Sequence, residues 1–335
     1  MINFKELKII LSKLNKKNKK IVFTIGSTSK INNHKSYITP VRRVSGFIIV
    51  GVNIYLKKEF DKLAKIICKY VDYIFIDCEK KIKQNISIIS LINEKKKFTN
   101  VFFYKGNDLT VEATDDLISY CFRKEVYGIQ NKKICILGAG NIGSKLALKF
   151  VERGAKVNIV RRKIEKLKII TKALNIIKPR FEKQIINCFS SNLAASKDAE
   201  IILGCSSSQN PIVNSSLLRE CKNVRVIVDI GKGSISKDAV NYAMRNSIKI
   251  FRLDISYSLL SMVINKINVD KFFSTKMGRK KIKNRFLVSG GQMGKKGDLI
   301  VDDFNKPNIL YGIADGKGDF LNRFNNFSYR QFNKK

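Results

Sequence analysis

Three glycines in the middle of the chain have the spacing that dinucleotide-binding turns use. They form a GxGxxG motif that follows an apolar run at 134–137 and opens a helical pattern. The first glycine permits a tight turn, the second lets the backbone approach a pyrophosphate, and the third lets the helix pack close to the strand. Free amides at the helix start would hold the diphosphate. A glycine-rich turn that binds nothing is the alternative, but the flanking strand and helix favour a binding site formed by Gly138, Ala139, Gly140, Asn141, Ile142 and Gly143.

Two arginines stand where an NAD site would carry a carboxylate, about twenty residues after the motif. Arg161 and Arg162 follow the apolar run 157–160. Guanidinium groups pair with phosphates through charge-assisted hydrogen bonds, so an adenosine 2′-phosphate would bind here. The alternative is that both are solvated surface cations. Because arginine is scarce in this chain while lysine is common, we expect NADP as the cofactor.

Small residues follow the strand predicted at 201–204, where the chain passes the switch point of the sheet. Cys205, Ser206 and Ser207 would leave room for a nicotinamide ring, so we expect them to contact the cofactor. Cys205 as a nucleophile is the alternative. The sequence places no identifiable base near it, and we therefore favour a packing role for the thiol.

The first hundred residues alternate strand-like and helix-like patterns. Apolar runs predict strands over 21–25, 47–52, 73–78 and 101–104, and helical periodicity predicts helices over 4–14, 56–70 and 82–96. Such alternation is typical of a mostly parallel open α/β sheet. The first helix could lie on an anionic membrane surface, but its narrow apolar stripe favours packing on the sheet.

The polar segment 26–43 predicts a long loop at the carboxyl end of the first strand, the edge where open α/β sheets bind ligands. Its side chains suit an anionic substrate, although a plain surface excursion is equally compatible with them. The group consists of Lys30, His34, Tyr37, Arg42 and Arg43.

A second domain is expected after a connecting helix. Strands are predicted over 134–137, 157–160, 201–204, 224–229 and 248–253, with helices over 142–153, 163–174, 236–246 and 259–267. Glycine-separated apolar pieces at 299–301 and 309–313 predict hairpins that pack on the domains. The expected fold class is α/β with two domains, an N-terminal open α/β sheet plus a Rossmann doubly wound parallel sheet, and a Gly-rich β-hairpin tail. The expected parts are a substrate domain, a connecting helix, an NADP-binding domain and the tail, over 1–107, 108–128, 129–269 and 270–335.

These features together resemble one superfamily of NAD(P)-dependent dehydrogenases with an amino-acid-dehydrogenase-like N-terminal domain. Its members include shikimate dehydrogenase, the methylene-tetrahydrofolate and methylene-tetrahydromethanopterin dehydrogenases, and glutamyl-tRNA reductase. The resemblance covers residues 20–265 in architecture. Its specific motifs are GAGNIG at 138–143, NIVRR at 158–162 and GCSSSQNPIV at 204–213. The glycine-rich tail matches no member.

The resemblance implies a pair of catalytic residues. In shikimate dehydrogenases an Asp at the start of the connecting helix pairs with a Lys of the N-terminal domain to move the substrate's proton. Asp115 lies at a similar distance before Gly138, although the glycine that follows the family's Asp is absent here. Lys105, at the end of the fourth strand, is the expected partner if burial lowers its pKa. A helix-surface carboxylate is the alternative interpretation of Asp115.

Composition narrows the class of protein. The formal net charge of +38 is typical of a nucleic-acid binder, but lysine is spread through every segment and no nucleic-acid-binding motif is present. The seven cysteines form no CxxC pair, which favours a reducing cytoplasm. A single histidine, His34, excludes the usual His-based metal clusters and Ser-His-Asp triads. No apolar run is long enough for a membrane span, and no secretory signal is evident.

The sequence therefore predicts a cytoplasmic NADP-dependent dehydrogenase or reductase. It would transfer a hydride to or from a small carbonyl, imine or pterin-type substrate in the interdomain cleft. The expected partners are this small-molecule substrate, which the basic loop would suit if it is anionic, and a second copy in a homodimer, with no metal, nucleic acid or membrane. A non-catalytic NADP-binding sensor or scaffold is the alternative, since it would keep the glycine motif without a cleft acid or base. A nucleic-acid-binding protein is the third hypothesis, and it predicts affinity that falls steeply with salt.

Overall fold

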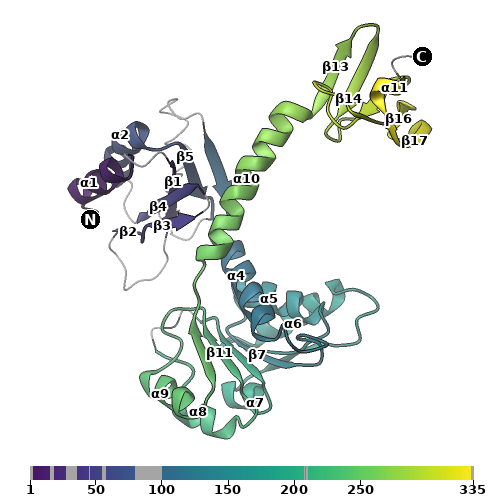
Figure 1. The fold of residues 1–335 in the computed structure, drawn as a ribbon. Coiled ribbons are helices and arrows are strands. Elements are labelled where there is room, and N and C mark those ends of the chain that lie inside the picture. Colours follow the sequence, from purple (N-terminus) through teal and green to yellow (C-terminus); the bar gives the residue numbers. More distant parts are fainter. Residues whose placement is uncertain are drawn as a thin grey trace. The chain divides into compact units, whose positions relative to one another are not determined.

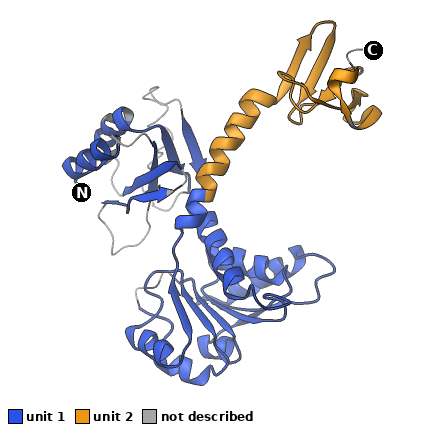
Figure 2. Ribbon diagram, viewed as in Figure 1, with its two compact units in different colours: residues 1–260 blue, residues 261–335 orange. Residues whose placement is uncertain are grey.

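The chain forms two compact units, residues 1–260 and 261–335 (Figure 2). Two sheets belong to the first unit and one to the second (Figure 1). The computed structural model describes residues 3–15, 19–27, 36–44, 46–54, 58–79, 100–206, 208 and 210–332. Within these residues, no helix has the length and apolar character that a bilayer span requires.

The first sheet has the strand order β2-β4-β1-β5-β6, with β3 paired to β4. Four strands are parallel: β1 (Lys20–Ser27), β4 (Phe47–Ile54), β5 (Tyr73–Asp77) and β6 (Val101–Tyr104). Helices α1 (Phe4–Asn15) and α2 (Lys58–Tyr70) contribute to its core. Leu7, Leu11 and Leu14 of α1 are buried there, which confirms that the first helix packs on the sheet.

The segment predicted as one long loop contains two short strands. β2 (Tyr37–Ile38) and β3 (Arg42–Val44) run antiparallel to β4, and they correct the prediction of a loop over 26–43. Strands of two and three residues are too short to show alternation, so only pairing with β4 reveals them. Lys30 and His34 of this segment, and the helix predicted at 82–96, lie outside the described residues.

The second sheet has the strand order β12-β11-β10-β7-β8-β9, and all its strands are parallel. This is the doubly wound order, so the predicted fold class is confirmed. The strands are β7 (Lys133–Leu137), β8 (Lys156–Val160), β9 (Ile186–Phe189), β10 (Ile201–Gly204), β11 (Val226–Asp229) and β12 (Lys249–Arg252). The helices are α4 (Gly106–Cys121), α5 (Asn141–Val151), α6 (Ile164–Ile177), α7 (Asn192–Ser196), α8 (Ser215–Glu220) and α9 (Lys237–Arg245).

Both faces of this sheet are covered. Helices α4, α5 and α6 share one core with alternate residues of the strands, and α7, α8 and α9 share the other. Ile134 and Ile136 face the first core, whereas Cys135 and Leu137 face the second. A strand buried on both faces is apolar along its whole length, which is why β7 and β10 are visible in the sequence.

The outer edge of β9 is closed by a side chain of α6. Asn175 Nδ2 donates to the Ile186 carbonyl at 2.8 Å, and the Ile186 amide donates to Asn175 Oδ1 at 2.9 Å. In a parallel pair both groups of one residue point to the same side, so Asn175 occupies the side away from β8. This side chain replaces a neighbouring strand at that position.

Unit 2 is built on a five-stranded sheet in the order β13-β14-β15-β16-β17. Its pairs are antiparallel except for β14 with β15. The elements are β13 (Gly278–Ile282), β14 (Arg285–Ser289), β15 (Leu299–Val301), β16 (Ile309–Ala314), β17 (Phe320–Ser328) and α11 (Tyr329–Phe332). It has its own core, formed around Leu287, Leu299, Val301, Leu310 and Tyr329.

Helix α10 (Ser256–Lys276) continues well past the predicted end of the last helix. The expected boundary at 270 therefore falls inside a helix. Residues 268–275 are exposed, and the apolar side chains of this part of α10, Val269, Phe272 and Phe273, are each at least 40% exposed. That the tail packs on the other domains stays a prediction.

Four charged residues form a network at the amino edge of the second sheet. Lys132 Nζ lies 2.7 Å from a Glu125 oxygen and 3.3 Å from a Glu200 oxygen. Arg225 contacts the same two carboxylates at 2.6 and 3.5 Å. Hydrogen bonds from Lys132 and Arg225 hold the pKa of Glu125 below its usual value. The network thus joins the start of β7 to the segment before β11.

We expect Glu125→Gln to lower the free energy of unfolding at pH 7 by about 1 kcal/mol, because both cations lose one carboxylate at a partly exposed site. A carboxylate with a lowered pKa stabilises the fold above its unfolded pKa and loses this effect as pH falls towards its folded pKa. The difference in the free energy of unfolding between wild type and variant should therefore shrink below about pH 4.5. Urea unfolding at several pH values measures it, with the exposed Glu152→Gln as control. A difference independent of pH would contradict the network's role.

Candidate dinucleotide-binding site

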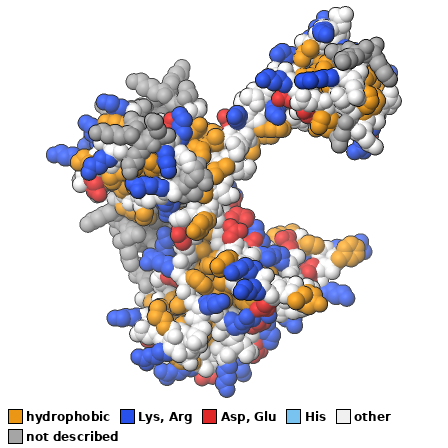
Figure 3. Space-filling view, viewed as in Figure 1, with side chains coloured by type: hydrophobic (Ala, Val, Ile, Leu, Met, Phe, Trp, Pro, Cys, Tyr) orange, Lys and Arg blue, Asp and Glu red, His pale blue; other side chains and the backbone are white. Residues whose placement is uncertain are grey.

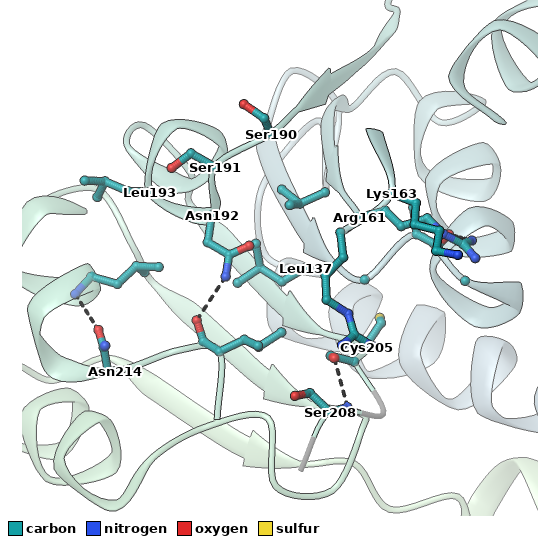
Figure 4. Close-up of a pocket in the computed structure, with 18 of the residues that line it drawn as sticks. Leu137, Arg161, Lys163, Ser190, Ser191, Asn192, Leu193, Cys205, Ser208 and Asn214 are labelled. Atoms are coloured by element: carbon teal, nitrogen blue, oxygen red, sulfur yellow. Dashed lines mark hydrogen bonds between the residues drawn. The ribbon is translucent and has the colours of Figure 1, made fainter. Parts of the chain in front are cut away.

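A pocket of about 1160 Å³ lies at the carboxyl edge of the second sheet (Figure 4). The loops that follow β7, β8, β9 and β10 all contribute to its lining. Among the residues expected to bind the cofactor, seven line it: Gly138, Ala139, Gly140, Arg161, Arg162, Cys205 and Ser206. The structure thus brings together residues that lie up to 68 positions apart in the chain.

The three glycines of the motif have different surroundings in the structure. Gly138 has a φ of +123°, and a Cβ there would lie 2.9 Å from the Ser206 nitrogen. A Cβ on Gly143 would collide with the Gly138 carbonyl. At Gly140, by contrast, no described atom lies within 4 Å of where a Cβ would stand. The first and third glycines therefore serve the fold, and the second faces open space.

Helix α5 begins directly after Gly140, which is its N-cap residue and offers no side-chain cap. The amides of its first turn are consequently available to a ligand, and the positive end of the helix dipole lies there. Asn141, Ile142 and Gly143 occupy this turn but do not line the pocket. The side chain of Ile142 packs against the core of the sheet instead.

The end of β8 carries three cations in a row. Arg161 Nη1 donates to the Ala139 carbonyl at 2.7 Å, so part of its guanidinium holds the glycine turn. Arg162 and Lys163 are exposed and line the pocket. The sequence reasoning did not include Lys163, although it directly follows the two arginines. Positive charge therefore gathers at one end of the pocket, and Leu193 and Asn214 lie at the other (Figure 4).

The loop after β10 is held by close backbone packing. A Cβ on Gly231 would collide with the Ser206 carbonyl, and Gly138 lies against the preceding peptide, which joins Cys205 to Ser206. Burial raises the pKa of the Cys205 thiol far above its usual value, which supports the packing role over the nucleophile. Ser207 lies outside the described residues.

A carboxylate at the end of β11 fixes the neighbouring loop. Asp229 Oδ1 accepts hydrogen bonds from the Ser234 amide at 3.1 Å and hydroxyl at 2.6 Å. Its other oxygen accepts from the Gly233 amide at 2.7 Å, and the Ser234 hydroxyl also lies 3.2 Å from the Gly204 carbonyl. Sequence reasoning missed this arrangement, for which the only signal was a strand ending in DIGKGS.

The two residues expected to be catalytic are not brought together. Lys105 is the N-cap of α4, and Asp115 lies ten residues further along the same helix, a rise of about 15 Å. Asp115 forms ion pairs with Arg153 and Lys149 of the α5 side. Lys105 is half exposed, and a hydrogen bond from its ammonium to Asp108 raises its pKa instead of burial lowering it.

Asp108 lies at the start of the connecting helix, where the resemblance puts the catalytic Asp, although Asp115 is nearer the family's distance from Gly138. It lies in the first turn of α4, 3.0 Å from Lys105 Nζ, and it also contacts Lys145. Although burial opposes it, hydrogen bonds from Lys145 and Lys105 hold the pKa of Asp108 below its usual range. Asp108 was missed because the candidate Asp was chosen by its distance before Gly138 and not by the start of the connecting helix, which was predicted at 108 and begins at Gly106.

Two side chains of the predicted anion-binding loop, Tyr37 and Arg42, form hydrogen bonds within the fold. Asn53 Nδ2 donates to the Tyr37 hydroxyl at 2.5 Å. Arg42 Nε donates to the Ser256 hydroxyl at 2.6 Å, at the start of α10. Arg43 is exposed on β3. Within the described part of the chain, no group of His, Cys, Asp and Glu side chains is arranged to hold a metal ion.

Comparison with known proteins yields one family match. Residues 122–254 match the shikimate/quinate 5-dehydrogenase family. The glutamyl-tRNA reductase of Campylobacter jejuni (strain RM1221) is 24% identical over 131 residues, which are 39% of this chain and 28% of that protein. The chain thus matches about a quarter of the length of this curated relative. The two findings confirm the predicted resemblance to the NAD(P)-dependent dehydrogenase superfamily, without identifying a member, and they support dehydrogenase or reductase chemistry.

Two solved structures resemble the chain at low identity. L-tryptophan dehydrogenase from Nostoc punctiforme is 12% identical with a TM-score of 0.46, covering 76% of this chain and 78% of that one. A dipicolinate synthase chain from Bacillus halodurans is 15% identical with a TM-score of 0.37, covering 75% of this chain and 98% of that one.

The different surroundings of the glycines lead to a paired prediction. Gly140→Ala should leave the melting temperature unchanged, because the added methyl meets no protein atom, yet it should weaken dinucleotide binding by about tenfold or more by blocking the phosphates. Gly143→Ala should lower the melting temperature, because its methyl collides with the Gly138 carbonyl. Thermal unfolding and titration calorimetry with NADPH check both. A Gly140→Ala variant that binds like wild type would place the ligand elsewhere.

Proposed function

We propose that the pocket binds NADP(H) and that the protein is an NADP-dependent oxidoreductase. The observation that carries this proposal is the turn after β7, which opens α5 onto a pocket with Arg162 and Lys163 at its rim. The dehydrogenase-family match over 122–254 contains all of these residues and supports the same conclusion. The substrate would be a small carbonyl, imine or pterin-type molecule. We also propose that the protein forms a homodimer and is located in the cytoplasm.

The pocket residues fit the parts of the cofactor in order. Gly140 and the first amides of α5 would hold the pyrophosphate, since no side chain of the described residues caps them. Arg162 and Lys163 would pair with the adenosine 2′-phosphate. Arg161 would add those N–H groups that do not donate to the Ala139 carbonyl. Cys205 and Ser206 would leave room for the nicotinamide. The bound cofactor would supply the hydride chemistry, and the chain orients it.

Lys105 and Asp108 are the proposed proton-handling pair. The ion pair keeps Lys105 protonated, so its ammonium can donate a hydrogen bond to a substrate oxygen; its raised pKa makes it a weaker acid than a free lysine. Asp108 would orient that ammonium, and Lys145 in turn anchors Asp108 to α5. Asp115 would have no role in catalysis. It would be a carboxylate on the surface of α4 that joins this helix to α5 through its ion pairs.

A non-catalytic NADP-binding sensor is the second candidate. The observation in its favour is that Lys105 is already neutralised by Asp108, which in turn contacts Lys145. A sensor would need the glycine turn and the cations of β8 but no proton-handling group. Turnover measurements on variants of the ion pair separate the two candidates.

Cofactor preference tests the role of the β8 cations. The double variant Arg162→Ala, Lys163→Ala should bind NADPH about 10- to 100-fold more weakly, because two charge-assisted contacts to a phosphate are lost. Its affinity for NADH should stay within about twofold, since NADH lacks that phosphate. Fluorescence titration measures both constants, with Lys172→Ala on α6 as a matched control. Equal loss for both cofactors would contradict the assignment.

The ion pair is tested by turnover. A thermal-shift screen of small acids, amino acids and pterins with NADPH present identifies a substrate. We then expect Lys105→Met and Asp108→Asn to lower kcat by about 100-fold or more, and Asp115→Asn to stay within about twofold. Glu112→Gln, which breaks a neighbouring α4–α5 pair, is the control for helix packing.

Intact turnover in both Lys105 and Asp108 variants would remove the pair from the mechanism. NADPH binding without turnover of any candidate would favour the sensor.

A further inference from the structure

Unit 2 carries a strongly basic hairpin that the proposed function does not use. No acidic residue occurs between Asp270 and Asp298, whereas nine lysines and arginines do. Five of these cations lie in β13, β14 and the turn between them: Arg279, Lys280, Lys281, Lys283 and Arg285. We call β13, β14 and their turn, residues 278–289, the basic hairpin. Figure 3 shows Lys and Arg side chains over this part of unit 2.

The cations of the basic hairpin are largely unneutralised. Arg279 alone is paired, through both of its donor groups, with the buried carboxylate of Asp298. Among the described residues, Lys281, Lys283 and Arg285 have no carboxylate within ion-pair distance, and Lys280 donates to the amide oxygen of Asn305. The hairpin therefore presents a surplus of positive charge to solvent.

Four other aspartates of unit 2 accept hydrogen bonds from backbone amides of their own turns. Each accepts at least one hydrogen bond from a nearby amide, which directs its charge into a turn. These aspartates are Asp302, Asp303, Asp315 and Asp319. Their carboxylates keep their negative charge, but all four lie outside the basic hairpin, and residues 271–297 contain no acidic residue.

An aromatic ring lies among these cations. Phe286 of β14 is directly opposite Lys281 of β13, so the two side chains share one face of the hairpin, and Arg279 lies on the same face two residues away. Ile282 and Leu287 of the opposite face belong to the core of unit 2. On the face of Phe286, Val288 is fully buried beside Gly294, so this face is open at Phe286 and Lys281 and covered at Val288. Phe286 is 36% exposed, and the Arg279 guanidinium lies 3.6 Å from its ring centroid. Asp298 thus fixes Arg279, and Arg279 fixes the ring.

We propose that the basic hairpin binds a single-stranded nucleic acid. Lysines and arginines along an exposed edge strand complement a chain of phosphates, and an exposed, fixed aromatic ring offers a base a surface for stacking. Lys281 contacts phosphates on the face that carries Phe286, Lys283 contacts them from the turn, and Phe286 stacks with a base. Lys280 lies on the opposite face and adds to the positive potential, and the Arg285 guanidinium stacks on Phe332 at 4.7 Å from its ring centroid. The inference is independent of the proposed oxidoreductase activity, because every residue it uses belongs to unit 2.

Two plainer explanations make different predictions. The whole chain carries a net charge of +38, so weak binding to any polyanion is expected from every surface. Lysines on an edge strand such as β13 also protect a sheet from pairing with other chains. The first explanation predicts equal effects of charge removal anywhere, and the second predicts aggregation of the variants without a change in affinity.

The test is fluorescence anisotropy of the full chain with a labelled oligothymidylate at several salt concentrations. The hairpin variant is Lys280→Gln, Lys281→Gln, Lys283→Gln, and the matched control is Lys166→Gln, Lys172→Gln, Lys222→Gln, three exposed lysines of unit 1. We expect the hairpin variant to bind at least about tenfold more weakly, with the slope of log affinity against log salt reduced by about 2. The control should bind within about twofold of wild type. Circular dichroism melting verifies that both variants fold.

Phe286→Leu separates stacking from charge. It should weaken binding by about tenfold while leaving the salt slope unchanged. Equal losses in the hairpin and control variants, or no binding by wild type at low salt, would overturn the proposal. So would aggregation of the hairpin variant with unchanged affinity of its soluble fraction, or hairpin-dependent binding to vesicles containing phosphatidylserine with none to the oligonucleotide.

Discussion

The candidate site depends on one close backbone contact. The backbone of Ser206 is approached by Gly138 at its nitrogen and by Gly231 at its carbonyl, and neither glycine has room for a Cβ. The carboxyl ends of β7, β10 and β11 can therefore approach one another more closely than side chains would allow. This contact sets where the loop after β10 runs, and the pocket is the space left between that loop and the end of β8.

Polar interactions then fix the elements around this contact. Asp229 and Ser234 hold the loop after β11 to Gly204, and Arg161 holds the glycine turn through Ala139. On the other side of the sheet, Lys149 of α5 pairs with Glu112 of α4 at 2.9 Å, between the pairs made by Asp108 and Asp115. The helix that offers its amino terminus to the pocket is thus tied at three levels to the connecting helix.

The sequence revealed those features that local chemistry dictates. β7 and β10 are apolar throughout because both faces are buried, and the GxGxxG turn requires glycines whatever the rest of the chain does. The basic end of β8 was visible for the same reason, since the charge lies in consecutive residues. The short strands β2 and β3 and the basic strands β13 and β14 were missed, because pairing with neighbours stabilises them more than any pattern of their own.

The proton-handling pair shows why the remainder of the site was not predictable. Asp108 and Asp115 are both carboxylates on one helix, and Asp108 lies beside Lys105 because Lys105 is the N-cap residue, three positions before it. Gly231 and Asp229 likewise gain their roles from loops that meet in space. Such pairings depend on where elements begin and end, which sequence patterns locate only within a few residues.

The side chain of Asn175 has a consequence for self-association. It occupies both hydrogen-bonding groups of Ile186, so the outer strand of the second sheet offers no free backbone there to a second copy of the chain. Two symmetry-related copies cannot form one continuous sheet through this residue. If the protein is a dimer that uses this edge, its shared backbone hydrogen bonds cannot include those of Ile186.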